Sequence, residues 1–389
     1  MKNILYICLF VFVFFSLEAK EHKSKRKAKS STSSESVWEK ELREKIAKKD
    51  PPSWMVERIQ KDCAPFAEAK ITKVMLDENM AESARRGNNC HFVRYKISNN
   101  QLEILENNTK KYGDEGSRVR EAAVTSSLNS LLKNASLSDC EFIITMHDHF
   151  DEKVFSAPVL TFAKSTTKGG KGILIPDFEA LSYEYGKNFL DKIEETKTLY
   201  VWKNKENIAI WRGACTGKGK GGEEHYSREN FLQFPRSLLV SLSLRAPEEI
   251  DARFTTLDWF SEDFKKQWGS YFSSSLSMQD HLKYKYQILI DGNSCAYSRG
   301  YWEFFSRCLT FKEESDNIQW YYGALEPYVH YVSFTLEDLV DKIDWARKND
   351  VKAYQIAQNA RSFSEENLSY SSILYYFYLV LGEYSKLQG

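Results

Sequence analysis

The stretch YQILIDGNSCAYSRGYWEF, residues 286–304, joins a short apolar run to a polar turn and a second apolar segment. Its first five residues are apolar apart from one glutamine, which is typical of a strand buried in a parallel sheet. Gly292 and Asn293 suit a tight turn. Ser294 and the backbone N–H groups after it can hold an anion at a helix start, with Arg299 adding charge. The stretch predicts a strand–turn–helix unit, and an ordinary connection without a ligand is the simpler alternative.

Other short apolar runs extend this pattern along the chain. They lie at residues 141–146, 157–162, 172–176, 207–211, 308–312 and 330–334. Helical patterns lie between and before them, at 37–49, 54–71 and 117–133, and a capped helix begins near Thr335. Apolar strands that alternate with helices predict an α/β fold with parallel sheets.

Length and composition set the scale of the protein. The chain has 389 residues, of which 42% are hydrophobic and 14% aromatic, so two lobes with sizeable cores are expected. We predict an N-terminal lobe at 37–195, a C-terminal lobe at 196–350 and closing helices at 351–389, with the lysine-rich stretch 185–206 at the boundary. The formal net charge is zero, which removes the global basic field expected of a nucleic-acid-binding protein.

The N-terminus has an apolar run at residues 4–17 with Lys2 before it and Ala19 as a cleavage position. A run of fourteen residues without charge suits a signal peptide better than a full membrane span. The basic and serine-rich residues 20–36 after it predict a disordered linker, but their positive charge also suits a short anchor. Residues 1–19 are therefore either a signal peptide, which places the body in the secretory lumen or outside the cytoplasm, or an anchor with the body on the cytoplasmic side.

The motif MHDHFDE, residues 146–152, follows a predicted strand and offers Asp148 as a general base. His147 and His149 are weak metal candidates, because alternate residues of a strand point to opposite faces and no third ligand is evident. The cysteines show no CxxC spacing, so a zinc site is not expected. A loop carboxylate without a catalytic role is the alternative for Asp148.

A second polar motif, WRGACTGKGKGGEE, covers residues 211–224. A P-loop needs GxxxxGK followed by Ser or Thr, whereas here Lys218 is followed by Gly219. Arg212, Gly213 and Thr216 still suit phosphate, because a guanidinium can contact phosphate oxygens in pairs. We predict that the first half of the motif faces a phosphate and that residues 218–224 form a flexible rim.

Taken together, these motifs resemble glycosyltransferase family 90, which includes Rumi-type protein O-glucosyltransferases and capsule- and lipopolysaccharide-associated relatives. The resemblance is strongest in HLKYKYQILIDGNSCAYS, CLTFKEES and LEPYVHYVSFTLEDLVDKIDWARKND, and it extends over most of residues 56–384. It implies a GT-B architecture, with two Rossmann-like lobes and a UDP-sugar between them. It also implies an inverting reaction that needs no metal ion and no cofactor.

The resemblance assigns roles to residues at matching positions. Asp148 matches the base that takes the proton from the acceptor hydroxyl, and Glu314 matches a ribose or uridine contact. The donor-binding residues that it implies are Arg212, Gly213, Thr216, Gly292, Asn293, Ser294, Cys295, Ala296, Tyr297, Arg299 and Glu314. Glucose or xylose is the expected sugar, and the expected partners are the UDP-sugar and an acceptor hydroxyl, with membrane association through the N-terminus and no nucleic acid.

Two departures from the family pattern bear on function. The family turn runs to an aromatic–Arg pair, whereas here Tyr297 is followed by Ser298 and the arginine comes one place later, at Arg299. The stretch 106–140 also lacks the cysteine-bearing segment of Rumi-type enzymes. A glycan or lipopolysaccharide acceptor is therefore as well supported as a protein Ser/Thr, and a non-catalytic member that binds nucleotide sugar is the alternative function.

Overall fold

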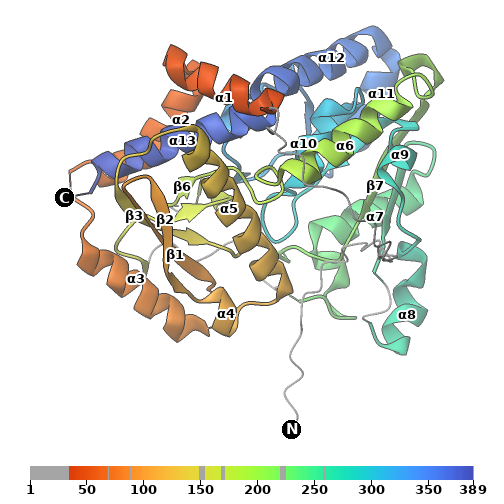
Figure 1. Ribbon diagram of the computed structural model, residues 1–389. Coiled ribbons are helices and arrows are strands. Elements are labelled where there is room, and N and C mark those ends of the chain that lie inside the picture. The colour runs from red at the N-terminus through yellow and green to blue at the C-terminus, as the bar shows by residue number, and fades with distance from the viewer. Residues whose placement is uncertain are drawn as a thin grey trace, which may run out of the picture.

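The computed structural model describes residues 35–68, 70–87, 90–148, 154–167, 171–219, 225–256 and 260–388. Two five-stranded sheets lie side by side, one formed by the first half of the chain and one by the second (Figure 1). The predicted signal or anchor at 1–19 and nearly all of the linker at 20–36 lie outside the described residues. Within the described part of the chain, no helix has the length and apolar character that a membrane span requires.

The first sheet has the strand order β2-β1-β3-β4-β6. Its strands are β1 (Phe92–Ser98), β2 (Gln101–Asn107), β3 (Cys140–Thr145), β4 (Leu160–Thr161) and β6 (Ile173–Leu174). The β3–β4 and β4–β6 pairs are parallel, but β1 pairs antiparallel with both β2 and β3. The prediction of parallel strands is confirmed for β3, β4 and β6 and is wrong for the pairs that β1 makes. Asn99 and Asn100 adopt positive φ angles of 51° and 59° and close the two-residue hairpin between β1 and β2.

The second sheet has the order β12-β10-β9-β7-β8, and all of its strand pairs are parallel. Its strands are β7 (Glu206–Gly213), β8 (Ile250–Phe254), β9 (Tyr284–Leu289), β10 (Leu309–Glu313) and β12 (Val332–Phe334). The α/β fold with a parallel sheet is therefore confirmed. A short antiparallel pair, β5 (Lys164–Ser165) with β11 (Asn317–Ile318), connects the two halves.

Helices surround both sheets. In the first half they are α1 (Val37–Lys48), α2 (Ser53–Cys63), α3 (Lys73–Arg86), α4 (Thr109–Tyr112), α5 (Glu115–Asn134) and α6 (Tyr183–Thr196). In the second half they are α7 (Pro235–Arg245), α8 (Glu262–Trp268), α9 (Met278–His281), α10 (Ser298–Phe305), α11 (Leu339–Lys348), α12 (Asp350–Asn367) and α13 (Tyr370–Lys386). The helix predicted at 54–71 is shorter than expected, because a 3-10 turn that contains Pro65 follows Cys63.

The last two helices connect the halves. Helix α12 packs against α10, α11 and β10 of the second half, whereas α13 packs against α1, α2, α5 and β3 of the first. Tyr376 and Tyr384 of α13 are fully buried, which explains why the aromatic C-terminal segment is a core helix. Six cysteines in the described residues, from Cys63 to Cys308, are unpaired thiols.

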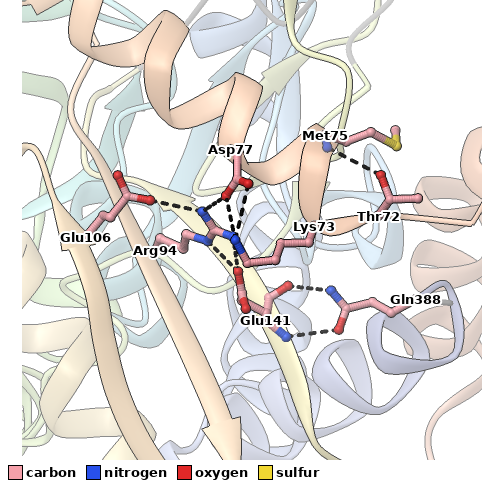
Figure 2. A network of polar contacts seen from close by, with 8 residues as sticks. All are labelled: Thr72, Lys73, Met75, Asp77, Arg94, Glu106, Glu141 and Gln388. Carbon is pink, nitrogen blue, oxygen red and sulfur yellow. Dashed lines mark hydrogen bonds and ion pairs between the residues drawn. The ribbon is translucent and has the colours of Figure 1, made fainter.

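A buried arginine organises the edge of the first sheet next to the C-terminus (Figure 2). Arg94 of β1 is 3% exposed, and it donates hydrogen bonds to Asp77 at 2.6 Å, Glu106 at 2.9 Å and Glu141 at 2.5 Å. The backbone N–H of Glu141 donates to the side-chain oxygen of Gln388 at 2.9 Å. One cation thus holds carboxylates from α3, β2 and β3, and the last residues of the chain attach to the same strand.

We expect Arg94→Met to lower the free energy of unfolding by about 3–5 kcal/mol, because it removes the cation that three carboxylates share. Chemical denaturation followed by circular dichroism measures the change. Lys73→Met is the control, because Lys73 pairs with the same Asp77 but is exposed, so its loss should cost about 0.5 kcal/mol or less. Equal effects of the two substitutions would show that burial of Arg94 is unimportant.

Candidate active site

Asp148 follows β3 and lies where the two halves of the chain meet. Its carboxylate accepts a hydrogen bond from Arg120 of α5, with Nη2 and Oδ1 2.6 Å apart. Arg120 also donates to the carbonyl of Met146 at 2.9 Å, and its guanidinium lies 4.7 Å from the ring centre of Phe178. An ion pair of this kind favours the ionised form of the carboxylate. Arg120 was missed by the sequence analysis, because nothing in a helical pattern marks an arginine that pairs with a residue 28 positions away.

The turn after β9, residues 291–297, contacts Asp148 from the second half. Asn293 Nδ2 lies 3.3 Å from Asp148 Oδ2, and the Tyr297 hydroxyl donates to the Asp148 carbonyl at 2.8 Å. Ser294 Oγ lies 2.9 Å from the same Tyr297 hydroxyl. Burial and the nearby Asp148 raise the pKa of Tyr297 well above its usual range, so the hydroxyl keeps its proton. Tyr297 has a φ of 31°, which is unusual for a bulky residue and is typical of functional sites.

The loop after β7, residues 213–219, which we call the donor loop, lies against the same turn. Arg236 of α7 joins the two segments: it donates to Thr216 Oγ1 at 2.6 Å, to the Ala214 carbonyl at 3.1 Å and to the Asp291 carbonyl at 2.8 Å. A side chain at position 292 would displace the contact between Arg236 and Thr216, because a Cβ there would lie 2.8 Å from both Arg236 Nη2 and Thr216 Oγ1. Arg236 was also missed, since its sequence context is an ordinary helix start after Pro235.

The two arginines that the sequence analysis did predict, Arg212 and Arg299, lie next to the start of the donor loop. The guanidinium of Arg212 pairs with Asp251 of β8 at 2.7 Å and is buried. Arg299 of α10 donates to the carbonyl of Arg212, and its Nη1 lies 3.6 Å from the carboxylate of Glu303. Arg212, Arg236 and Arg299 therefore lie together at the ends of β7 and β9, where Asp251 and Glu303 pair with two of them.

A comparison with known families identifies the chain. The model of the family described as glycosyl transferase family 90 matches residues 48–389. The chain belongs to this family. The resemblance drawn from the sequence motifs is therefore confirmed.

Individual relatives in glycosyl transferase family 90 are moderately similar. The chain is 30% identical to protein O-glucosyltransferase 2 of Danio rerio over 80% of its length, and 26% identical to protein O-glucosyltransferase 3 of Homo sapiens over 87%. These matches span 59% and 65% of the two relatives. A crystal structure of Anabaena Alr3699/HepE with UDP and glucose aligns with 65% of this chain and 73% of that one, at 12% identity. Its TM-score is 0.37.

The remaining residues predicted from the family pattern lie around the same turn. Cys295 is buried, and Ala296 accepts a hydrogen bond from the Arg299 N–H at 2.9 Å. Glu314 directly follows β10 and is exposed, whereas its neighbour Glu313 accepts a hydrogen bond from the Asp291 N–H at 2.9 Å. Burial and Asp291 raise the pKa of Glu313 to about 7. Glu313 therefore supports the turn, while the predicted role of Glu314 remains a prediction. Residues 220–224 of the rim predicted at 218–224 lie outside the described residues, as does His149.

The loop after β6 brings two carboxylates to the site that the sequence analysis did not identify. Glu179 accepts a hydrogen bond from the backbone N–H of Ser298, at the start of α10, at 2.9 Å. Asp177 is buried, and burial together with Glu179 raises its pKa to about 7. Because Glu179 belongs to the first half and Ser298 to the second, this bond crosses between the halves as the Asp148 contacts do.

The described residues include one buried histidine close to the predicted donor residues. Burial and the neighbouring Arg299 lower the pKa of His281 to about 3, so this histidine is neutral at physiological pH. In the described part of the chain, no group of three His, Cys, Asp or Glu side chains could hold a metal ion. Asp148 contacts two of the predicted donor residues, Asn293 through its carboxylate and Tyr297 through its backbone carbonyl.

Glu303 predicts how stability depends on pH. Its side chain is fully buried, and burial raises its pKa from 4.5 to about 8, although Arg299 partly opposes this. Because the folded pKa is higher than the unfolded one, the protein should lose stability as pH rises from about 4.5 to 8. We expect Glu303→Gln to unfold at a higher temperature than wild type at pH 8.5, by several degrees, and at nearly the same temperature at pH 5.

Differential scanning calorimetry at the two pH values measures this difference. Glu337→Gln is the matched control, because Glu337 is exposed and its substitution should change neither melting temperature. A Glu303→Gln protein that melts with wild type at both pH values would show that the buried carboxyl does not ionise in this range.

Proposed function

We propose that the protein is an inverting glycosyltransferase that moves a sugar from a UDP-sugar to a hydroxyl of its acceptor. The observation that carries the proposal is the contact of Asp148 with Asn293 and Tyr297. These bonds bring a carboxylate from the first half of the chain to the turn that the family pattern assigns to the donor. A base beside a donor site is the arrangement that direct displacement at the anomeric carbon requires.

The proposed reaction assigns proton removal to one group of the site and stabilisation of the leaving diphosphate to others. Asp148 takes the proton from the acceptor hydroxyl as the oxygen attacks the anomeric carbon from the face opposite to UDP. The bond to the UDP oxygen breaks, and negative charge develops on the leaving diphosphate. The negative charge on the diphosphate is stabilised by Arg299, Arg236 and the N–H groups of the turn. These cations and dipoles are already in place, so they stabilise the charge without rearrangement. The proposed reaction therefore uses no metal ion and no cofactor.

The donor and acceptor follow from the relatives. Because the relatives are named protein O-glucosyltransferases, we propose UDP-glucose as donor and a protein Ser/Thr hydroxyl as acceptor. Xylose remains the alternative sugar, and a glycan or lipopolysaccharide hydroxyl the alternative acceptor. A lumenal location fits the apolar run at 4–17, with membrane association if that run is retained. The two sheets and the site between them are consistent with the GT-B architecture that we propose.

A UDP-release assay on a panel of UDP-sugars, with and without acceptor proteins, tests the proposal. We expect slow release of UDP from UDP-glucose that an acceptor accelerates and that excess EDTA leaves unchanged. Saturable binding without release, measured by ligand-observed NMR, would instead support a non-catalytic nucleotide-sugar-binding protein. Acceleration by glycans but not by proteins would replace the proposed acceptor, and loss of release in EDTA would contradict metal independence.

A further inference from the structure

The side-chain amide of Asn293 connects two parts of the site. Its oxygen accepts a hydrogen bond from the backbone N–H of Gly217 in the donor loop at 3.1 Å. Its nitrogen donates to the carboxylate of Asp148 at 3.3 Å. The two bonds determine the orientation of the amide, because a reversed amide would place an oxygen against the carboxylate and an NH2 group against an N–H.

The donor loop holds a defined conformation on one side of this amide. Gly217 has a φ of 135°, which residues with side chains rarely adopt. The preceding Thr216 accepts hydrogen bonds from Arg236 at its hydroxyl, at 2.6 Å, and from the Tyr226 hydroxyl at its carbonyl, at 3.1 Å. The position of the Gly217 N–H is therefore determined by the same contacts that shape the loop.

On the other side, the carboxylate of Asp148 is held at both oxygens. Arg120 donates to Oδ1 at 2.6 Å and Asn293 donates to Oδ2 at 3.3 Å. The charged group on α5 and the amide of the turn thus face the carboxylate from opposite halves of the chain, and Tyr297 holds its backbone carbonyl. Arg120 belongs to the first half, whereas Asn293 also accepts a hydrogen bond from the donor loop.

We propose that Asn293 is a positioning residue that couples the conformation of the donor loop to the alignment of the catalytic base. The Gly217 N–H orients the amide, and the amide orients the Asp148 carboxylate toward the acceptor hydroxyl. A change in the conformation of the donor loop therefore changes the alignment of the base. This inference rests on the proposed function, because it assigns a base and a donor to the same site.

The side-chain chemistry at position 293 is specific to this role. Coupling needs a side chain that accepts a hydrogen bond from the Gly217 N–H and donates one to the Asp148 carboxylate. The amide of asparagine does both. A carboxylate would keep the bond from Gly217 but would place a second negative charge beside Asp148. That charge favours the protonated form of Asp148, so the base should become active only at higher pH.

The test is the pH profile of kcat/KM for the acceptor, measured at saturating donor in wild type and in Asn293→Asp. Saturation removes effects on donor affinity. We expect the acid limb to move to higher pH by about one unit, so activity two units below the optimum should fall about 10-fold. Asn317→Asp is the matched control: its amide also donates to a carboxylate near the turn, that of Asp291 at 2.9 Å, and its acid limb should coincide with that of wild type.

A second variant tests the coupling itself. Gly217→Ala strains the loop at its positive φ without touching Asp148, and we expect it to lower kcat for the acceptor at saturating donor. Asn293→Asp and Gly217→Ala profiles that match wild type at saturating donor, with changes confined to the KM for donor, would overturn the proposal.

A readout without turnover separates this inference from the proposed function. Aspartate labelled with ¹³C at the carboxyl carbon reports the titration of Asp148 by NMR, assigned with Asp148→Asn. We expect the titration midpoint to rise in Asn293→Asp and not in Asn317→Asp, whether or not any sugar is transferred. An unchanged midpoint would refute the contact between Asn293 and Asp148. A shifted midpoint in a protein that transfers no sugar would support this contact and refute the proposed glycosyltransferase reaction.

Discussion

Asp148→Asn should lower the rate of sugar transfer by about 100- to 10,000-fold, which is the usual contribution of a positioned general base. The amide keeps an oxygen for the bond from Arg120 but cannot accept the proton of the acceptor hydroxyl. Donor binding should change little, because in the proposed mechanism Asp148 acts on the acceptor hydroxyl and not on the donor diphosphate. Initial rates of UDP-sugar turnover and the Kd for UDP by isothermal titration measure the two effects.

Two controls make this result interpretable. Asp191→Asn removes a carboxylate from exposed α6, where it pairs with Lys187, and should leave transfer unchanged. The melting temperature of Asp148→Asn shows whether loss of the ion pair with Arg120 alters the fold. A variant that keeps full activity would exclude Asp148 as the base, and Glu179 would become the next carboxylate to examine.

Arg236→Met should weaken UDP binding by about 10- to 100-fold, equivalent to about 1.4–2.8 kcal/mol. Methionine fills much of the same volume but leaves Thr216, Ala214 and Asp291 without the cation that joins the donor loop to the turn. Charge-assisted hydrogen bonds contribute about 1.5–3 kcal/mol each, so the loss is large compared with an ordinary substitution. Isothermal titration with UDP measures the Kd.

Arg245→Met is the matched control, because Arg245 is the last residue of the same helix and is exposed. It should bind UDP with wild-type affinity and unfold at the wild-type temperature. If Arg236→Met bound UDP normally while unfolding at a lower temperature, Arg236 would be a structural residue that does not shape the donor site.

Local sequence patterns predicted much of the second half of the chain. Apolar runs at 207–211, 286–290 and 308–312 became β7, β9 and β10, because strands buried on both faces must be apolar throughout. The first half was harder to predict. β1 and β2 carry charges such as Arg94, Glu103 and Glu106, and their antiparallel pairing depends on the two-residue turn at Asn99 and Asn100, which the sequence analysis did not identify.

Some candidate site residues could be predicted from the local sequence, whereas their contacts could not. Asp148 and the turn at 291–297 were predicted because each directly follows an apolar strand, where ligands of α/β sheets bind. Arg212 was predicted for the same reason, yet its guanidinium is paired with Asp251, and its predicted contact with the donor remains a prediction. Nothing in the local sequence indicates which carboxylate will form an ion pair with a buried arginine.

By itself, the sequence therefore determined the family, the strand–turn–helix units and the carboxylate that we propose as base, since periodicity and motif order are local properties. Only the tertiary structure decided the partners of these residues. Arg120, Arg236 and Glu179 joined the site because the fold places segments 28 to 119 residues apart within hydrogen-bond distance. The link from Gly217 through Asn293 to Asp148 exists for the same reason: it spans both sheets, and no local pattern records a contact between them.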